Sequence, residues 1–275
     1  MKLRFLSWLL VILALASPLA AQPSAAPAVE GTIFDGMALP GLAWSTMGNF
    51  SPIEHNNGYS ESYVEQGATV FASNSGSTTV TPYASLGLVL DSKGYPWNDK
   101  IEPRIGVKLN RVFRSGVVSV GSAYSYEDRF KSATGSGLIV YTQAWFGWQE
   151  VSHKSNRFPG SSWVVLGNIS PVENGNVLAW SHISQGIVAK RFSKATLVPY
   201  GEVTLARDSK HFDWNNKAVM GTGVKAVFAQ GDTYSELGAA YLEEHRFYSG
   251  GSAGGLTLFL NVSYSWNLLG RSLGR

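Results

Sequence analysis

Residues 256–268 read L-T-L-F-L-N-V-S-Y-S-W-N-L, and apolar side chains alternate with polar ones along this stretch. One face carries Leu256, Leu258, Leu260, Val262, Tyr264, Trp266 and Leu268, while the other carries Thr257, Asn261, Ser263, Ser265 and Asn267, with Phe259 as the single exception. Because successive side chains of a β-strand point to opposite sides, this stretch predicts a strand with one apolar and one polar face.

The same alternation recurs upstream in about twelve segments separated by turn signals. It is clear in residues 79–90 and 101–111, and noisier in 117–127, 195–206 and 218–228. Segments 60–73 and 177–191 do not alternate cleanly, so the sequence leaves open which of their side chains face which way.

Two architectures accommodate such strands. A soluble sandwich packs the apolar face against a second sheet, whereas an outer-membrane barrel turns it toward lipid and lines its interior with the polar face. Three features favour the barrel: charges of both signs in mid-strand, Tyr and Trp near strand ends, and connections that alternate between short and long. We therefore predict an all-β fold, a twelve-stranded antiparallel transmembrane β-barrel surrounded by the lipid of the bacterial outer membrane.

The amino terminus has the pattern of an export signal. Lys2 and Arg4 precede an apolar run that is too short to span a bilayer, and small residues follow it. We expect a signal peptide over residues 1–21, a periplasmic lead-in over 22–40 and the barrel over 41–275. Removing residues 1–21 leaves 20 basic residues (22 − 2) against 19 acidic ones, a balance that gives no reason to expect nucleic-acid binding.

Composition excludes further classes. Only 15% of the residues are charged, against roughly 25% in an ordinary soluble domain. The hydrophobic share of 44% is too high for a disordered chain, and the absence of cysteine excludes a disulfide-stapled fold and a zinc-finger array.

An internal duplication supports the even strand count. Sliding the chain by 117 residues aligns residues 82–130 with 199–247 and gives 18 identities, where chance gives about three. Upstream, G-N-x-S-P-x-E occurs at residues 48–54 and again at 167–173. We predict two six-stranded halves, about 41–149 and 160–268.

The polar faces of the predicted strands supply the candidate lumen residues. They are Glu102, Arg104, Lys108 and Glu127 in one half and Glu202, Lys225, Glu236 and Glu244 in the other. Mixed charges on facing walls either pair into a network that fills a narrow barrel or line a path for polar solutes. The sequence leaves open whether the lumen is open, and which solute it takes.

Two repeated outer loops suggest glycan recognition. They read D-S-K-G-Y-P-W-N-D-K at residues 91–100 and D-S-K-H-F-D-W-N-N-K at 208–217. Aromatic rings beside amides and carboxylates suit a sugar, which presents an apolar C–H face and a rim of hydroxyls. The candidates are Asp91, Trp97, Asn98, Asp208, Trp214 and Asn215. The alternative is that the tryptophans pack within the loops while Asp and Asn shape the turns.

Catalysis has little support in the sequence. A lipid hydrolase would need a His and a Ser on one face with an orienting partner, and His182 lies near Ser181 and Ser184 without an evident partner. No metal-binding spacing such as H-E-x-x-H occurs. We expect no enzyme, no metal and no cofactor, although a lipid- or glycan-modifying enzyme on a barrel scaffold stays the alternative, with a structural or adhesive barrel as a second one.

The chain resembles Gram-negative outer-membrane β-barrels through its export signal, its alternating strands and the closing V-S-Y-S-W-N-L-L. More narrowly, Gln66-Gly67, Pro82-Tyr83 and the stretch from Asp91 to Asn98 are similar to the carboxy-terminal barrel of phage-adsorption and exopolysaccharide-secretion outer-membrane proteins. This resemblance implies a passage or surface component linked to exopolysaccharide export or recognition. It also implies polysaccharide, or a periplasmic secretion component, as a partner.

Overall fold

The computed structural model describes residues 38–55, 57–149, 156–230 and 232–268. The expected signal peptide over residues 1–21 and nearly all of the lead-in lie outside the described residues. Within the described ranges, no helix is long and apolar enough to cross a membrane.

Twelve long strands follow one another along the described chain. They are β1 (Pro40–Gly48), β2 (Tyr59–Gly67), β4 (Thr78–Asp91), β5 (Lys100–Phe113), β6 (Gly116–Arg129), β7 (Thr134–Trp148), β8 (Gly160–Asn168), β9 (Leu178–Gly186), β11 (Thr196–Asp208), β12 (Lys217–Gln230), β13 (Thr233–Arg246) and β14 (Ser252–Asn267). Two-residue strands β3 (Phe71–Ala72) and β10 (Lys190–Arg191) pair antiparallel with β4 and β11, and a 3₁₀ turn, η1 (Asp213–Asn215), precedes β12.

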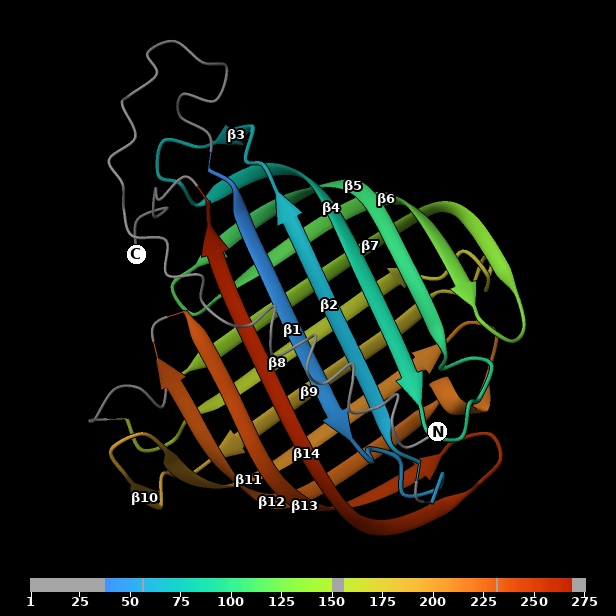
Figure 1. The fold of residues 1–275 in the computed structure, drawn as a ribbon, viewed down its shortest axis with the longest axis vertical. Coiled ribbons are helices and arrows are strands. Elements are labelled where there is room, and N and C mark those ends of the chain that lie inside the picture. The colour runs from blue at the N-terminus through green and yellow to red at the C-terminus, as the bar shows by residue number, and fades with distance from the viewer. Residues whose placement is uncertain (1–37, 56, 150–155, 231, 269–275) are drawn as a thin grey trace. The chain divides into compact units, whose positions relative to one another are not determined.

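These strands close into a barrel, which Figure 1 shows from the side. Each long strand pairs antiparallel with its sequence neighbour. The first and last strands close the ring, from Pro40 opposite Asn267 to Gly48 opposite Phe259. The predicted twelve-stranded antiparallel barrel is confirmed. Closure matters because it leaves no unpaired long edge that lipid would have to solvate.

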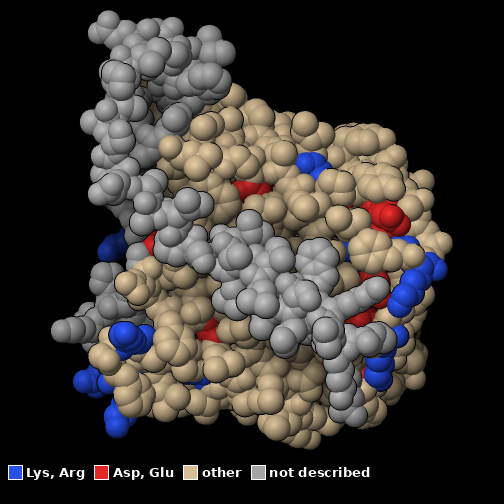
Figure 2. Space-filling model, in the orientation of Figure 1, with Lys and Arg blue, Asp and Glu red and all other residues tan. Residues whose placement is uncertain are grey.

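The barrel wall has an apolar outer face. Ile105, Leu138 and Leu256 are each about two-thirds exposed, while Glu102 and Thr257 on the opposite faces of the same strands are buried. Most of the Lys and Arg side chains visible in Figure 2 lie at the two ends of the barrel, and the wall between them is mainly uncharged. An apolar exterior around a polar interior is stable in lipid and unfavourable in water.

The structure assigns a direction to the two segments whose facing the sequence leaves open. On β2, Tyr63 and Glu65 face inward, because Glu65 pairs with Lys108 of β5 and accepts a hydrogen bond from the Tyr63 hydroxyl at 2.7 Å. Ser62 faces outward and hydrogen-bonds Ser45 of β1 at 2.9 Å. The alternation was unreadable because this strand, like β9, carries serine and glutamine on its lipid side.

Phe259, the exception on the polar face of β14, is also explained. Its ring is buried inside the barrel, where it packs edge-on against Tyr200 of β11 at 6.2 Å between centroids. Val219, Ala240 and Leu242 complete this cluster, and Phe50 packs against it from the β1–β2 loop. A second cluster covers the opposite wall and consists of Tyr83, Ala123, Ile139 and Tyr141, with Ile169 of the β8–β9 loop packed against it. Two apolar clusters therefore narrow the lumen from opposite sides.

Candidate functional site: the lumen and its outer mouth

The eight predicted lumen residues all lie on inward-facing positions of the strands. Glu102, Glu127, Glu236 and Glu244 are buried, and Arg104, Lys108, Glu202 and Lys225 are partly exposed. The role of these residues in conduction stays a prediction.

Most of the lumenal charges are paired. The Lys225 ammonium lies 2.5 Å from Glu236 of the neighbouring strand, and the Lys108 ammonium binds Glu65 from two strands away. Both lysine ammonium groups also lie over aromatic rings. The Lys225 ammonium is 5.0 Å from the centroid of the Tyr200 ring. Paired charges in a partly dry interior hold their neighbours in fixed positions, so these pairs give the two walls a defined shape.

Arg104 connects the wall to a loop. Its guanidinium lies 2.6 Å from the Glu102 carboxylate and donates to the Ile169 carbonyl at 3.2 Å. Because Ile169 belongs to the β8–β9 connection, that loop is held inside the mouth of the barrel. Ser125 of β6 donates a further hydrogen bond to Glu102 at 3.0 Å, so the buried carboxylate is well satisfied.

The repeated G-N-x-S-P-x-E motif binds the β8–β9 loop to the opposite half. Ser170 of this motif donates to the buried Glu127 carboxylate at 2.5 Å. Arg129 lies between Glu127, at 2.7 Å, and the motif's Glu173, at 2.6 Å. Asn176 donates to Glu173 at 2.8 Å, which completes the network.

The other copy of the motif makes the same contacts with β13. Ser51 donates to Glu244 at 2.5 Å, and Arg246 lies between Glu244, at 3.0 Å, and Glu54, at 3.3 Å. Asn57 donates to Glu54 at 2.8 Å. Each half of the sequence therefore supplies a loop whose polar groups are satisfied by a strand of the other half.

The glycan candidates of the β4–β5 loop fold inward on one another. The Asp91 carboxylate accepts hydrogen bonds from the Asn98 amide at 2.8 Å and the Tyr95 backbone N–H at 3.1 Å. Gly94 has a φ of 66°, in the left-handed region where glycine is least strained. Asp91 and Asn98 thus shape this turn with their side chains.

The β11–β12 loop adopts the same turn. Asp208 accepts from the Asn215 amide at 2.9 Å and from the Phe212 backbone N–H at 3.0 Å. His211 replaces the glycine at the left-handed position with a φ of 63°, an uncommon conformation for a residue with a side chain. The Tyr248 hydroxyl holds the His211 ring at 2.5 Å and supports this conformation.

The two loops meet through a stack of four aromatic rings. Trp97 and Trp214 lie face to face, with centroids 5.2 Å apart and planes 10° apart. Tyr95 stacks on Trp97 with centroids 4.8 Å apart, and Phe212 stacks on Trp214 with centroids 4.9 Å apart. Since β4–β5 and β11–β12 lie opposite each other in the strand order, the stack reaches across the outer mouth. In this conformation each tryptophan of the stack lies against two other rings.

Asp213 of η1 adds an electrostatic contact at the mouth. Burial alone would raise the pKa of this carboxyl, but hydrogen bonds from Ser249 and the positive charge of Arg246 outweigh burial and lower the pKa below its usual range. The Ser249 N–H lies 2.9 Å from the carboxylate and the Arg246 guanidinium 3.7 Å from it. The ionised form of Asp213 therefore stabilises the loop.

His182 faces the lumen from β9. Its Nδ1 lies 2.9 Å from the Thr204 hydroxyl and its Nε2 lies 3.8 Å from the Glu202 carboxylate. Ser181, which the sequence places beside it, points to the other face and donates to the Leu205 carbonyl at 3.5 Å. Among the described residues, no three His, Cys, Asp or Glu side chains form a cluster that could hold a metal ion.

Several residues of the mouth were missed by sequence reasoning. These are Ser51, Glu54, Arg129, Ser170, Glu173 and Arg246. The repeat contains the signal that could have found them, because both the G-N-x-S-P-x-E motif and the E-x-R of each partner strand occur twice.

The closed ring, apolar exterior and charged interior define the class of this protein: it is a β-barrel of the bacterial outer membrane. No known family model and no curated protein matches the sequence.

Solved structures of similar fold are outer-membrane proteins. The COG4313 outer-membrane channel of Pseudomonas putida F1 superposes with a TM-score of 0.46 and 8% identity, over 83% of this chain and 95% of that one. The β-domain of the Bordetella autotransporter BrkA gives 0.40 and 12%, over 84% and 99%. A bacterial polysaccharide outer-membrane secretin gives 0.41 and 9%, over 83% and 98%.

Proposed function

We propose that this barrel is a passage for polar, hydroxyl-rich solutes across the outer membrane, linked to exopolysaccharide export or recognition. The Trp97–Trp214 contact spans its outer mouth and acts as the gate. The observation that carries the proposal is that loops from opposite walls meet over the lumen through ring stacking rather than through backbone pairing. Stacked rings are worth about 1 kcal/mol per pair beyond their buried area, so such a contact opens and closes readily.

The lumen supports transport of a polar solute. Charged residues of both signs follow the inner wall from the mouth, at Lys100 and Lys217, to the lower pair of Lys225 and Glu236. Lys100 lies 3.7 Å from Glu127, and Lys217 lies 3.5 Å from Glu244. Such groups exchange hydrogen bonds with a passing solute at low cost, because pairing is regained after the solute has moved on.

The loops support recognition of sugar. Tyr95, Trp97, Phe212 and Trp214 supply aromatic faces that match the C–H face of a pyranose. Because each tryptophan stacks against two other rings, a sugar reaches the stacked faces only when the stack separates. Recognition of the polymer and opening of the mouth are then one event.

Ion current through planar lipid bilayers tests this proposal. The wild type is expected to conduct rarely, since the stack covers the mouth. Replacing both rings, Trp97→Ala with Trp214→Ala, should give long-lived open channels. The matched control is Phe113→Ala with Phe146→Ala, which removes another contacting ring pair, with centroids 6.0 Å apart, from the periplasmic end of the wall.

Two results would count against the passage. If the Trp97→Ala, Trp214→Ala variant carries no current although it is folded, the lumen is sealed and the barrel is structural or adhesive. If the Phe113→Ala, Phe146→Ala control opens the channel equally, the mouth is not the gate. Heat-dependent migration on gels establishes that each variant is folded.

The enzymatic alternative has one supporting observation, the contacts of His182 with Thr204 and Glu202. A hydrolase would use Thr204 as nucleophile, His182 as base and Glu202 to orient the imidazole. Lipase and deacylase assays on wild type and His182→Ala test it. We expect no hydrolysis by either protein, and His182-dependent turnover would establish the enzyme instead.

A further inference from the structure

The lumenal carboxylates differ in whether a lysine or an arginine lies close enough to pair with them. Glu65, Glu102, Glu127, Glu236 and Glu244 each lie within 4.0 Å of a lysine or arginine. Among the described lumenal carboxylates, Glu61 and Glu202 lack such a partner. Glu61 accepts a hydrogen bond from the Tyr59 hydroxyl at 2.8 Å. The Glu202 carboxylate lies 3.8 Å from the Nε2 of His182.

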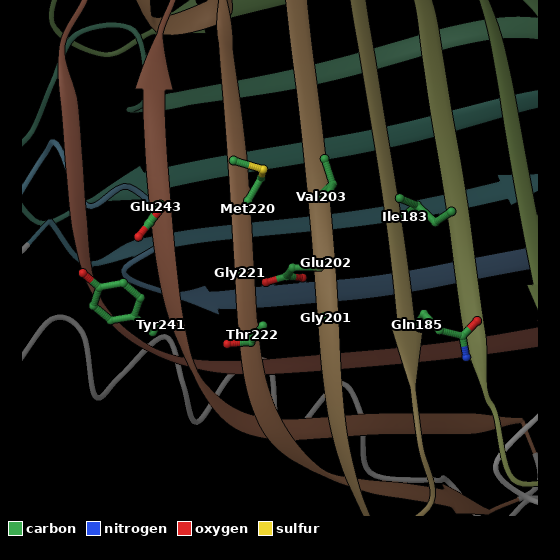
Figure 3. Close-up of a pocket in the computed structure, with 10 residues that line it drawn as sticks. All are labelled: Ile183, Gln185, Gly201, Glu202, Val203, Met220, Gly221, Thr222, Tyr241 and Glu243. Atoms are coloured by element: carbon green, nitrogen blue, oxygen red, sulfur yellow. The ribbon is translucent and has the colours of Figure 1, made fainter.

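The first half of the sequence shows what Glu202 lacks. At the positions equivalent to Glu202 and Gly221, that half carries Ser85 and Arg104. Arg104 fills its side of the lumen with a guanidinium that neutralises Glu102. On the other side Gly221 carries no side chain, so Leu242 and Glu202 both approach it: a Cβ built on Gly221 would lie 2.3 Å from Leu242 Cδ2 and 3.6 Å from the Glu202 carboxylate. Figure 3 shows Glu202 extending toward Gly221. At these positions the second half therefore keeps one acid, Glu202 in place of Glu102, whose equivalent is Val219, and has no counterpart of the Arg104 cation.

The surroundings of Glu202 resemble a sugar site. Thr204 and His182 lie beside it, and Trp163 stacks on His182 with centroids 5.8 Å apart. Trp180 continues the row at 6.1 Å from Trp163. The indole nitrogen of Trp180 is buried without a hydrogen-bond partner among the described residues. A buried polar atom without a partner costs free energy unless a water or ligand satisfies it.

We propose that Glu202, Thr204, His182, Trp163 and Trp180 form a lumenal subsite for a sugar residue that carries a free amino group. The ammonium of this sugar pairs with Glu202 and supplies the positive charge that Arg104 supplies in the first half. The Thr204 hydroxyl and the Trp180 N–H hydrogen-bond the sugar hydroxyls. This subsite rests on the proposed passage, whose solute class it narrows to polymers containing unacetylated hexosamine.

The test is calorimetric titration of the folded protein in detergent with two tetramers of β-1,4-linked glucosamine. One is fully deacetylated and the other fully N-acetylated, so they differ in their amino groups. The wild type should bind the deacetylated tetramer, and Glu202→Gln should weaken that binding about tenfold or more, because it removes the charge and keeps the shape. The acetylated tetramer should bind more weakly to the wild type and respond little to the substitution.

The matched control is Glu61→Gln, which neutralises the other lumenal carboxylate without a Lys or Arg partner and should leave the affinity unchanged. Each titration is repeated with Trp97→Ala, Trp214→Ala added, so that a closed mouth cannot hide the subsite. The proposal is overturned if the wild type does not prefer the deacetylated tetramer in either background. It is also overturned if Glu202→Gln binds that tetramer as tightly as the wild type does.

This measurement separates the subsite from the passage. Binding in detergent requires no transport, so a protein that binds the tetramer through Glu202 and carries no current keeps the subsite and loses the passage. A protein that conducts but binds independently of Glu202 keeps the passage and loses the subsite.

Discussion

The indole rings of Trp97 and Trp214 are stacked with centroids 5.2 Å apart and planes 10° apart, although 117 residues separate them in sequence (214 − 97). They occupy equivalent positions in the repeated loops, so the repeat brings two copies of one side chain together at the outer mouth. The contact between the two equivalent rings spans the mouth between opposite walls.

Ion selectivity tests the paired lysines of the lumen. Replacing Lys108 and Lys225 together with glutamine leaves the carboxylates of Glu65 and Glu236 without their cations. We expect the reversal potential under a salt gradient to shift toward cations, because the wall becomes negative. Lys190→Gln, at an exposed residue of β10, is the control and should shift it little. Unchanged selectivity in the double variant would show that these lysines do not line the path.

Stability tests the network at the mouth. Arg129→Met removes the cation between the buried Glu127 and Glu173, and we expect it to lower the free energy of unfolding by about 3 kcal/mol. Urea unfolding of the reconstituted barrel, followed by tryptophan fluorescence, measures the loss. Arg111→Met, at an exposed arginine, should change stability by no more than about 0.5 kcal/mol. Equal losses in the two variants would contradict a special role for Arg129.

Lipid quenching tests the facing of β2. The chain contains no cysteine, so Ser62→Cys and Tyr63→Cys each give one labelling site. A fluorophore at position 62 should be quenched by brominated lipid because Ser62 faces outward, whereas one at position 63 should be protected inside the barrel. The opposite pattern would mean that the strand is shifted by one residue.

The pH dependence of stability tests Asp213. Its pKa is lower in the folded protein than in the unfolded chain, so its contribution is present above the unfolded value of about 3.9 and is lost as the pH falls through the folded value. Unfolding free energies of wild type and Asp213→Asn should differ by up to about 1 kcal/mol at neutral pH and converge in acid. A difference that grows toward low pH would contradict the assignment.

The sequence predicts the barrel because every strand that faces lipid on one side must alternate apolar and polar side chains, whichever strands lie beside it. β14 and β5 show this alternation clearly, and the duplication gives an even strand count. β2 and β9 were unreadable because serine and glutamine occupy their lipid side. Such residues are tolerated where they satisfy one another, as Ser45 and Ser62 do, and a strand read alone does not show its partner.

The mouth was less predictable because its contacts join the two halves. The repeat marks Trp97 and Trp214 as special, but their stacking depends on barrel closure placing their loops opposite each other. The same holds for Arg129 and Glu173, which lie on different halves. The sequence suggested a free aromatic surface for glycan, whereas the structure covers those ring faces, and the glycan role stays a prediction.

Solute uptake by proteoliposomes tests the passage most directly. Vesicles containing the Trp97→Ala, Trp214→Ala variant should swell in isotonic neutral tetrasaccharide much faster than vesicles containing the wild type, because the lumen then admits the sugar from its outer end. The Phe113→Ala, Phe146→Ala variant should behave as the wild type does. If vesicles containing the folded Trp97→Ala, Trp214→Ala variant swell no faster than protein-free vesicles, the barrel is not a passage for sugars.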